Sequence, residues 1–141
     1  MQSITLLDYG AGNVRSVRNA IGRLGFEIRD VRRPADILDA ERLVFPGVGS
    51  FGNAMARLQA DGYVEPLRRY LEQDRPFLGI CLGLQTLFED SEESPGVAGL
   101  GLIPGRIRRF PDGELAVPQI GWNGLKVRKP SPLLAGYRGE K

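Results

Sequence analysis

The sequence contains no histidine, and its only cysteine is Cys81. Without histidine no Cys/His metal cluster can form, and a cysteine nucleophile would lack the base that most often activates it. A lone cysteine also excludes an internal disulfide, which fits a reducing compartment. We therefore expect neither a metal nor a cofactor.

Long apolar runs and a strong charge excess are missing as well. No run approaches the roughly 18 apolar residues that cross a bilayer, and the first three residues lead straight into an apolar segment, without a signal peptide. The net charge is only +2. The densest basic cluster, Arg106, Arg108 and Arg109, lacks interleaved stacking aromatics and is interpreted as a solvated strand face. The sequence predicts neither a membrane nor a nucleic-acid partner.

What the sequence does contain is an alternation of strand-like and helix-like segments over its first 90 residues. This order predicts an α/β fold, an open and mostly parallel sheet with helices on both faces. Ligands of such sheets bind beyond the carboxyl ends of the strands, and three of the four loops expected there are rich in glycine. The expected strands are Ile4–Asp8, Phe26–Val31, Leu43–Phe45 and Pro76–Ile80, with helices starting near Val14, Ala54, Val64 and Leu82.

The pattern changes after Ser91, where prolines and glycines become frequent and apolar runs shorten. A short antiparallel excursion is expected after residue 100, with strands at Leu100–Ile103, Ile107–Phe110 and Ile120–Val127. The chain ends at Lys141 in a polar stretch with no closing element. We expect residues 1–141 to form a single domain that is incomplete at its C-terminal side.

The strongest local signal is Gly79-Ile80-Cys81-Leu82-Gly83, a G-x-C-x-G run where a strand turns into a helix. It follows the logic of the G-x-S-x-G elbow with sulfur in place of oxygen. Glycines two residues to either side let strand and helix approach closely, and the helix N-terminus favours negative charge there. A lone cysteine is more often a buried structural residue, but this context reverses that preference.

The loop Pro46-Gly47-Val48-Gly49 is the second signal. Acyl transfer needs backbone N–H groups aimed at the developing oxyanion, and a glycine-rich loop beside the elbow can supply one while Leu82 supplies the other. An ordinary tight turn is the plainer interpretation. The same loop also reads Gly47-x-Gly49-x-x-Gly52, so a dinucleotide site is a competing hypothesis, although the next strand ends in Cys81 rather than in the expected acid.

Three segments together resemble class I glutamine amidotransferases: 8–13 (D-Y-G-A-G-N), 46–49 (P-G-V-G) and 79–85 (G-I-C-L-G-L-Q). Two later segments, 99–105 (G-L-G-L-I-P-G) and 118–123 (P-Q-I-G-W-N), are similar to the glutaminases of imidazole glycerol phosphate synthases. The resemblance covers essentially the whole chain. It implies hydrolysis of glutamine to glutamate and ammonia, with the ammonia passing to a (β/α)8-barrel cyclase subunit or fused domain in histidine biosynthesis.

The resemblance also implies residue roles and a location. Cys81 would form the glutamyl thioester, and the backbone of Gly47, Val48, Gly49 and Leu82 would form the oxyanion hole. Gln85 and Glu93 match positions that contact glutamine; without the resemblance, a solvated glutamine and an exposed charge are the simpler interpretations. Asn13 and Trp122 match positions at the barrel interface. The implied location is the cytoplasm, or a plastid stroma for a plant-type source.

Two departures from the family pattern bear on activity. Gln119 stands where the family often has a histidine that is not the catalytic base. The family's catalytic histidine and its partner glutamate lie in a Val-His-Ser-type strand and a Pro-x-Glu segment, both downstream of Lys141. The 141 residues alone are therefore expected to be inactive. A catalytically inactive regulatory or scaffolding subunit remains the alternative.

Overall fold

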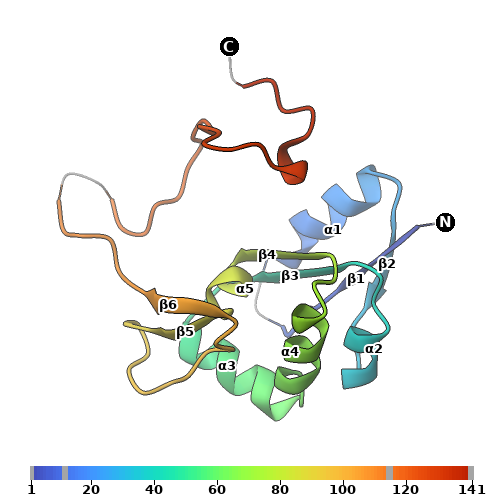
Figure 1. Ribbon diagram of the computed structural model, residues 1–141, viewed down its shortest axis with the longest axis horizontal. Helices are drawn as coiled ribbons and strands as arrows, with labels where there is room; N and C mark the ends of the chain where they lie inside the picture. The colour runs from blue at the N-terminus through green and yellow to red at the C-terminus, as the bar shows by residue number, and fades with distance from the viewer. Residues whose placement is uncertain (1, 11–12, 114–115, 140–141) are drawn as a thin grey trace. The chain divides into compact units, whose positions relative to one another are not determined.

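The computed structural model describes residues 2–10, 13–113 and 116–139, which fall into two compact units, Met1–Arg109 and Phe110–Lys141. The first unit is built on a four-stranded sheet in the order β2-β1-β3-β4 (Figure 1). Its strands are β1 (Ser3–Leu6), β2 (Glu27–Asp30), β3 (Leu43–Gly47) and β4 (Phe77–Cys81). Every neighbouring pair is parallel, which confirms the predicted parallel α/β sheet.

One face of the sheet is covered by α1 (Val14–Arg23). Val14 and Ile21, two turns apart on this helix, pack against Leu6 of β1 and Val44 of β3. The helix ends two residues before Gly25, whose φ of 82° marks the expected glycine stop. Asn13 occupies the N-cap position, but its left-handed backbone leaves its side chain without a capping hydrogen bond.

The other face carries the larger core and the helices α2 (Pro34–Leu38), α3 (Phe51–Ala60) and α4 (Val64–Glu72). Helices thus lie on both faces, as the sequence predicts. The core members with 0% exposure are Leu7, Ile37, Phe45, Phe51, Leu58, Leu67, Tyr70 and Leu100. The sequence pattern does not predict α2, which is only five residues long and is fixed by a cap: Asp36 Oδ2 accepts hydrogen bonds from the amides of Arg32 and Arg33 at 2.9 and 3.1 Å.

Beyond β4 the chain forms α5 (Leu82–Gln85), β5 (Phe88–Ser91) and β6 (Ile103–Ile107). The predicted antiparallel excursion is wrong here, because β5 and β6 pair in parallel. Antiparallel pairing is confined to the connection between them, where Ala98 forms a single bridge with Asp90. The amides of Gly99, Leu100 and Leu102 donate hydrogen bonds to backbone carbonyls between Thr86 and Glu89. These bonds hold the end of the connection against the start of β5, so β6 begins beside β5 and runs in the same direction.

The second unit contains one 3-10 turn, η1 (Pro132–Leu134), among its described residues. The predicted strand at Ile120–Val127 is wrong, because these residues are exposed and no described strand pairs with them. Strand propensity reflects packing against neighbours more than an intrinsic backbone preference, so a β-rich run without a partner stays irregular. Across the described ranges, no helix combines the length and the apolar character needed to cross a membrane.

Candidate active site

Cys81 is the last residue of β4 and the N-cap of α5, and its side chain is an exposed free thiol. Its φ of 54° and ψ of −113° lie outside the regions that non-glycine residues normally occupy. A residue held in this way costs of order 1–3 kcal/mol and persists only where its surroundings impose the conformation. The predicted strand-to-helix elbow is therefore present as a strained turn with the sulfur accessible.

The glycines on either side of Cys81 make the turn possible. A Cβ on Gly83 would lie 1.8 Å from the carbonyl oxygen of Phe45 in the neighbouring strand, and a Cβ on Gly79 would lie 2.9 Å from the backbone of Leu84. Neither position has room for a side chain. The close approach predicted from the G-x-C-x-G spacing is confirmed. The helix that follows has only four residues, so its dipole stabilises charge at Cys81 weakly.

The glycine-rich loop after β3 lies beside the elbow because β3 and β4 are adjacent parallel strands. In their register Gly47 is paired with Cys81. Beyond Gly47 the loop continues through Val48 and Gly49, whose φ of 109° requires glycine. A hollow of about 250 Å³ borders the loop and is lined in part by Tyr9, Val48 and Gly49. The predicted oxyanion-hole residues and the cysteine are thus brought to the same end of the sheet.

The N-terminus of α3, directly after this loop, is fully capped by side chains. Ser50 Oγ accepts from the amide of Asn53, Glu93 Oε2 accepts from Phe51 at 2.9 Å, and Ser94 Oγ accepts from Gly52 at 2.8 Å. A dinucleotide phosphate would need these same amides and would meet the carboxylate of Glu93. The G-x-G-x-x-G match is therefore a poor phosphate site. Glu93, predicted from the resemblance to contact substrate, lies next to the loop as a helix cap.

Tyr9 is a residue at this site that the sequence analysis does not single out. It follows β1 and packs edge-on against Phe45, with ring centroids 5.6 Å apart and planes at 77°. Its hydroxyl oxygen is buried and has no hydrogen-bond partner among the described residues. Burial, first of all, and then the negative charges of Cys81 and Asp8 raise the pKa of Tyr9 above its ordinary value. The sequence feature that could have identified Tyr9 is its position just after a predicted strand, in one of the three glycine-rich loops expected at the same end of the sheet.

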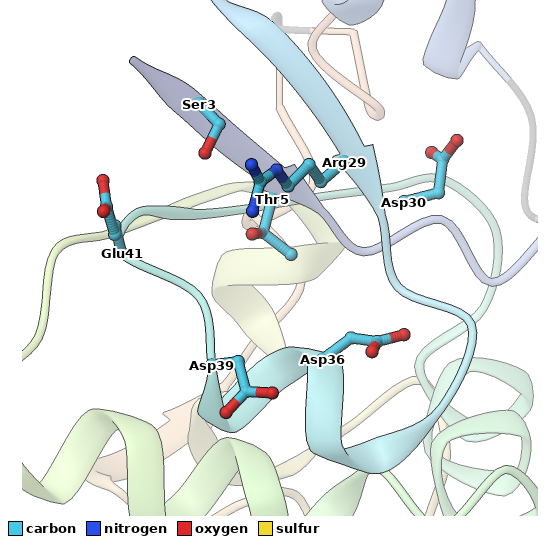
Figure 2. A pocket seen from close by; sticks show the side chains of 7 residues that line it. All are labelled: Ser3, Thr5, Arg29, Asp30, Asp36, Asp39 and Glu41. Atoms are coloured by element: carbon cyan, nitrogen blue, oxygen red, sulfur yellow. The ribbon is translucent and has the colours of Figure 1, made fainter. Parts of the chain in front are cut away.

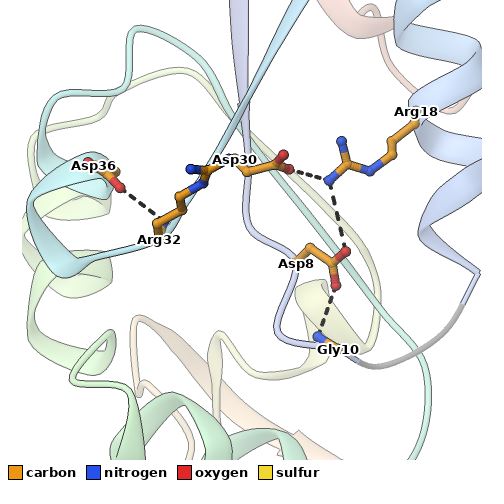
Figure 3. Close-up of polar contacts among 6 residues, drawn as sticks. All are labelled: Asp8, Gly10, Arg18, Asp30, Arg32 and Asp36. Carbon is orange, nitrogen blue, oxygen red and sulfur yellow. Dashed lines mark hydrogen bonds and ion pairs between the residues drawn. The ribbon is translucent and has the colours of Figure 1, made fainter.

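Polar contacts anchor the loop that carries Tyr9, as Figure 3 shows. Asp8 Oδ1 accepts a hydrogen bond from the amide of Gly10 at 2.9 Å. Arg18 of α1 lies 4.0 Å from Asp8 Oδ2 and also forms an ion pair with Asp30 at the end of β2. These contacts tie the first loop to both neighbouring elements, so the backbone that leads to Tyr9 is held in place.

The other predicted residues are distributed differently. Leu82 is buried at the start of α5, and Gln85 ends that helix, one turn after Cys81 and half-buried. Asn13 is exposed at the start of α1, and its Oδ1 accepts from Ser16 Oγ. Trp122 belongs to the second unit and is fully exposed, at 104%. Their roles as substrate and interface residues stay predictions.

A larger pocket of about 390 Å³ lies elsewhere, near the start of β1 and the segment before β3 (Figure 2). Its lining is polar: Ser3, Thr5, Arg29, Asp30, Asp36, Asp39 and Glu41. None of the predicted site residues lines this pocket. The predicted site residues therefore lie outside the larger of these two hollows.

Two arginines of the basic cluster, Arg106 and Arg108, form ion pairs with acidic residues at the end of β5 and just after it. Arg106 Nε lies 2.9 Å from Asp90 Oδ1, and Arg108 Nε lies 3.9 Å from Glu92 Oε1. These pairs join β6 and the residues after it to the end of β5. Their charges are balanced locally on an exposed strand surface, which agrees with the interpretation of a solvated face.

The fold and the site define a class of protein: an open parallel α/β domain with a cysteine at a strand-to-helix elbow beside a glycine-rich loop. The model of the family "Glutamine amidotransferase class-I" matches residues 5–127. The chain belongs to the class I glutamine amidotransferase family.

Within this family, the chain is similar to curated imidazole glycerol phosphate synthases. The chain is 60% identical over 132 residues to "Imidazole glycerol phosphate synthase hisHF, chloroplastic" of Arabidopsis thaliana, covering 93% of this chain and 22% of that protein. It is 48% identical over 139 residues to "Imidazole glycerol phosphate synthase subunit HisH" of Syntrophotalea carbinolica, covering 94% of this chain and 68% of the relative. The Thermus thermophilus subunit of the same name is 51% identical, with 86% and 60% covered. The chain thus spans about a fifth of the plant relative and roughly two thirds of the bacterial ones.

Among solved structures, "Crystal structure of glutamine amidotransferase" matches with a TM-score of 0.64 over 75% of this chain and 56% of that one. The sequence identity is 23%, so this likeness concerns the fold alone. It agrees with the parallel sheet and the position of the helices described above.

Proposed function

We propose that this chain is the glutaminase part of an imidazole glycerol phosphate synthase, with Cys81 as its nucleophile. The observation that carries the proposal is the backbone of Cys81, a non-glycine residue at positive φ whose strand partner, Gly47, begins the glycine-rich loop. Backbone strain of this kind is concentrated at active sites. The match to the class I glutamine amidotransferase family supports glutamine as the substrate, and the names of the relatives support the assignment to an imidazole glycerol phosphate synthase.

In the proposed reaction the Cys81 thiolate adds to the carboxamide carbon of the glutamine side chain. The backbone N–H groups of Leu82 and of the loop Gly47-Val48-Gly49 donate hydrogen bonds to the resulting oxyanion. The C–N bond then breaks, the nitrogen takes up a proton and leaves as ammonia, and a glutamyl thioester remains on Cys81. Water hydrolyses the thioester to glutamate and restores the thiol. Gln85 and Glu93 are proposed to contact the bound glutamine.

The proton transfers in this reaction need a positioned acid–base group, which contributes roughly 10²- to 10⁴-fold in rate. The 141 residues contain no histidine. Following the family resemblance, we propose that a histidine and a glutamate outside these residues complete the site. The lack of histidine also favours the second candidate function, a catalytically inactive regulatory or scaffolding subunit.

The proposed partner is a (β/α)8-barrel cyclase that receives the ammonia, either as a separate subunit or as part of the same polypeptide. The relatives' names support both arrangements, because one is called hisHF and another subunit HisH. Asn13 and Trp122 are proposed as contacts with the barrel. A fully exposed tryptophan suits this role, because tryptophan is enriched among the residues that dominate binding energy.

We further propose a reducing compartment, the cytoplasm or a plastid stroma, because the proposed chemistry needs the single thiol in its reduced form. Fractionation of cells that express the protein at its natural level checks this. Recovery from an oxidising compartment would contradict it.

Affinity labelling tests the nucleophile. A glutamine analogue with a chloroketone in place of the carboxamide is expected to alkylate Cys81 faster than a chloroketone without the amino-acid group. The two alkylation rates are also measured with a small free thiol, which gives the intrinsic reactivity of each reagent. If the ratio of the two rates is the same for the protein as for the free thiol, no glutamine site adjoins Cys81.

Turnover tests whether a catalytic base lies within the 141 residues. Glutamate release is measured with a barrel cyclase and its ligand present, for this chain and for the Syntrophotalea carbinolica subunit as the positive control. The 141 residues are expected to be at least about 10²-fold slower, the scale of a lost acid–base group. Turnover within about tenfold of the control would show that the base lies inside the chain.

A further inference from the structure

The loop Gly47-Val48-Gly49, here called the oxyanion loop, is held at both of its ends. At its start Gly47 belongs to β3 and pairs with Cys81 in the register of the sheet. Beyond its other end the chain enters α3, whose first residue, Phe51, is anchored in the core with 0% exposure. The loop between these points lies at the surface, where Val48 is 45% exposed. Its position therefore depends on how its two ends are fixed.

A distant segment, the turn after β5, fixes the second end. Ser94 Oγ accepts a hydrogen bond from the amide of Gly52 at 2.8 Å, and Glu93 Oε2 accepts one from the amide of Phe51 at 2.9 Å. These amides are the first two of α3, and the first amides of a helix have no acceptor within it. Each acceptor lies 42 residues further along the chain than its donor, so the start of α3 is tied to a separate part of the domain.

The close approach of Ser94 also accounts for the third glycine of the G-x-G-x-x-G match. A Cβ built on Gly52 would lie 2.9 Å from Ser94 Oγ, 3.2 Å from Ser94 Cβ and 3.8 Å from a methyl group of Val97. Carbon and oxygen ordinarily approach no closer than about 3.3 Å, so a side chain at Gly52 would push the two segments apart. This glycine serves the contact with Ser94 rather than a nucleotide phosphate.

Ser94 is itself held in a compact turn. Its amide donates to the carbonyl of Ser91 at 3.1 Å, and its carbonyl accepts from the amide of Val97 at 3.1 Å. Ser91 ends β5 and is 2% exposed, and Val97 packs against the core. The hydroxyl that meets Gly52 is therefore carried by a backbone that is tied to β5 and to the core.

We propose that Ser94 is a positioning residue for the oxyanion loop. Its hydroxyl fixes the amide of Gly52, and with it the point at which the loop enters α3, so it sets the position of the loop's backbone N–H groups beside the elbow. The inference rests on the proposed function, in which those N–H groups donate to the oxyanion. Ser94 acts through the backbone of Gly52 and makes no contact with the substrate.

The test is the rate at which the glutamine analogue with a chloroketone alkylates Cys81, the single cysteine of the 141-residue chain. The Cys81 thiolate displaces chloride and forms a C–S bond, while the adjacent carbonyl oxygen takes the place of the carboxamide oxygen in the oxyanion hole. Rates measured over a range of reagent concentrations at one pH give a limiting rate and a half-saturating concentration. The limiting rate reports the position of the loop, and the half-saturating concentration reports binding of the amino-acid group.

Ser94→Ala removes the acceptor and is compared with a matched control, Ser131→Ala. Ser131 Oγ accepts from the amide of Leu133 at 3.3 Å at the start of η1, so this change removes a cap of the same kind from the second unit. Gly52→Ala disturbs the same contact from its other side. Loss of a single hydrogen bond leaves a domain of this size folded, and urea unfolding of each variant is measured in parallel.

For Ser94→Ala the limiting rate is expected to fall about three- to tenfold, the scale of one hydrogen bond and less than the roughly 10²- to 10³-fold cost of removing an oxyanion donor outright. The half-saturating concentration should not change, because the contacts of the amino-acid group remain. Ser131→Ala should change neither quantity. Gly52→Ala should lower the limiting rate as well, and its effect should be smaller when Ser94→Ala is already present, because residues in contact are energetically coupled.

An unchanged limiting rate for Ser94→Ala, in a chain whose Cys81 is selectively labelled, would overturn the role of Ser94 and leave the proposed nucleophile intact. A loss of stability without a change in the limiting rate would likewise overturn it, by showing a purely structural cap. A rise in the half-saturating concentration alone would also overturn it, because Ser94 would then act on glutamine binding. Failure of the unchanged protein to be labelled selectively would instead refute the proposed function of Cys81.

Discussion

Replacing Gly83 by alanine is expected to be strongly destabilising, and the structure sets the scale. The new Cβ would lie 1.8 Å from the carbonyl oxygen and 2.8 Å from the carbonyl carbon of Phe45. Carbon and oxygen ordinarily approach no closer than about 3.3 Å, so the backbones must separate by more than an ångström. Phe45 has 0% exposure and belongs to β3, which is paired on both sides, so β3 cannot move away from Gly83 without disturbing its neighbours.

The cost follows from what such a movement disrupts. Overpacking a core costs about 1–3 kcal/mol when side chains can adjust. Here the clash is with backbone, and we expect a loss of about 3 kcal/mol or more from a total stability of about 5–15 kcal/mol. Gly79→Ala, whose Cβ would meet Leu84 at 2.9 Å, should be destabilised less.

Urea unfolding followed by circular dichroism measures this difference. With a slope of about 1–3 kcal/mol per molar urea, the midpoint for Gly83→Ala should fall by at least about 1 M. The control is Gly22→Ala in α1, where a Cβ meets nothing within 4 Å. That change should raise stability by about 0.5–1 kcal/mol, because alanine favours a helix interior. Equal midpoints for Gly83→Ala and the unchanged protein would refute the close-approach argument.

Three further outcomes are expected. Hydrogen bonds from the Arg32 amide, first of all, and from Arg33 hold the pKa of Asp36 below its ordinary value. The contribution of Asp36 to the stability of the fold is therefore present at neutral pH and lost as the pH falls below about 4. Asp36→Asn should cost about 1 kcal/mol at pH 7 and nothing in strong acid. Urea midpoints at both pH values check this, and an equal loss at both would contradict it. Arg75 stacks over Tyr70 at 4.4 Å and donates hydrogen bonds to the carbonyls of Leu38 and Ala40. Arg75→Ala should therefore cost about 2 kcal/mol in urea unfolding, and Arg75→Lys should recover less than half of that loss. Full recovery of stability by lysine would show that charge alone matters. Trp122→Ala should weaken binding of the proposed barrel partner by about 2 kcal/mol in calorimetry. It should leave the urea midpoint unchanged, since Trp122 is fully exposed. Unchanged affinity would remove Trp122 from the proposed interface.

Much of the sheet and of the elbow could be predicted because the signals are local. Val14, Val17 and Ile21 repeat at helical spacing, and α1 forms where they lie. The glycines around Cys81 report a backbone that only glycine permits, so the G-x-C-x-G spacing predicts the turn itself. The short helix α2 was missed because it depends on a cap at Asp36 rather than on an apolar stripe.

The errors lie after residue 100, where the predicted strands depend on partners. Ile107–Phe110 and Ile120–Val127 have β-type composition, but pairing decides whether such segments become strands. The chain pairs Ile103–Ile107 with Phe88–Ser91 in parallel. The segment Ile120–Val127 pairs with no strand in the described part of the chain. Composition contains no information on register or on the direction of a partner.

The sequence by itself determined the parallel α/β class, the elbow at Cys81 and the glycine-rich loops at one end of the sheet, because each is written in spacing over a few residues. Only the tertiary structure decided that Glu93 and Ser94 cap the helix that begins at Phe51, 42 residues earlier. It also decided that the Tyr9 hydroxyl meets Gly47 beside the elbow. Contacts between distant segments depend on the path of the chain and on which backbone groups remain unsatisfied after folding, and neither is encoded in a local pattern.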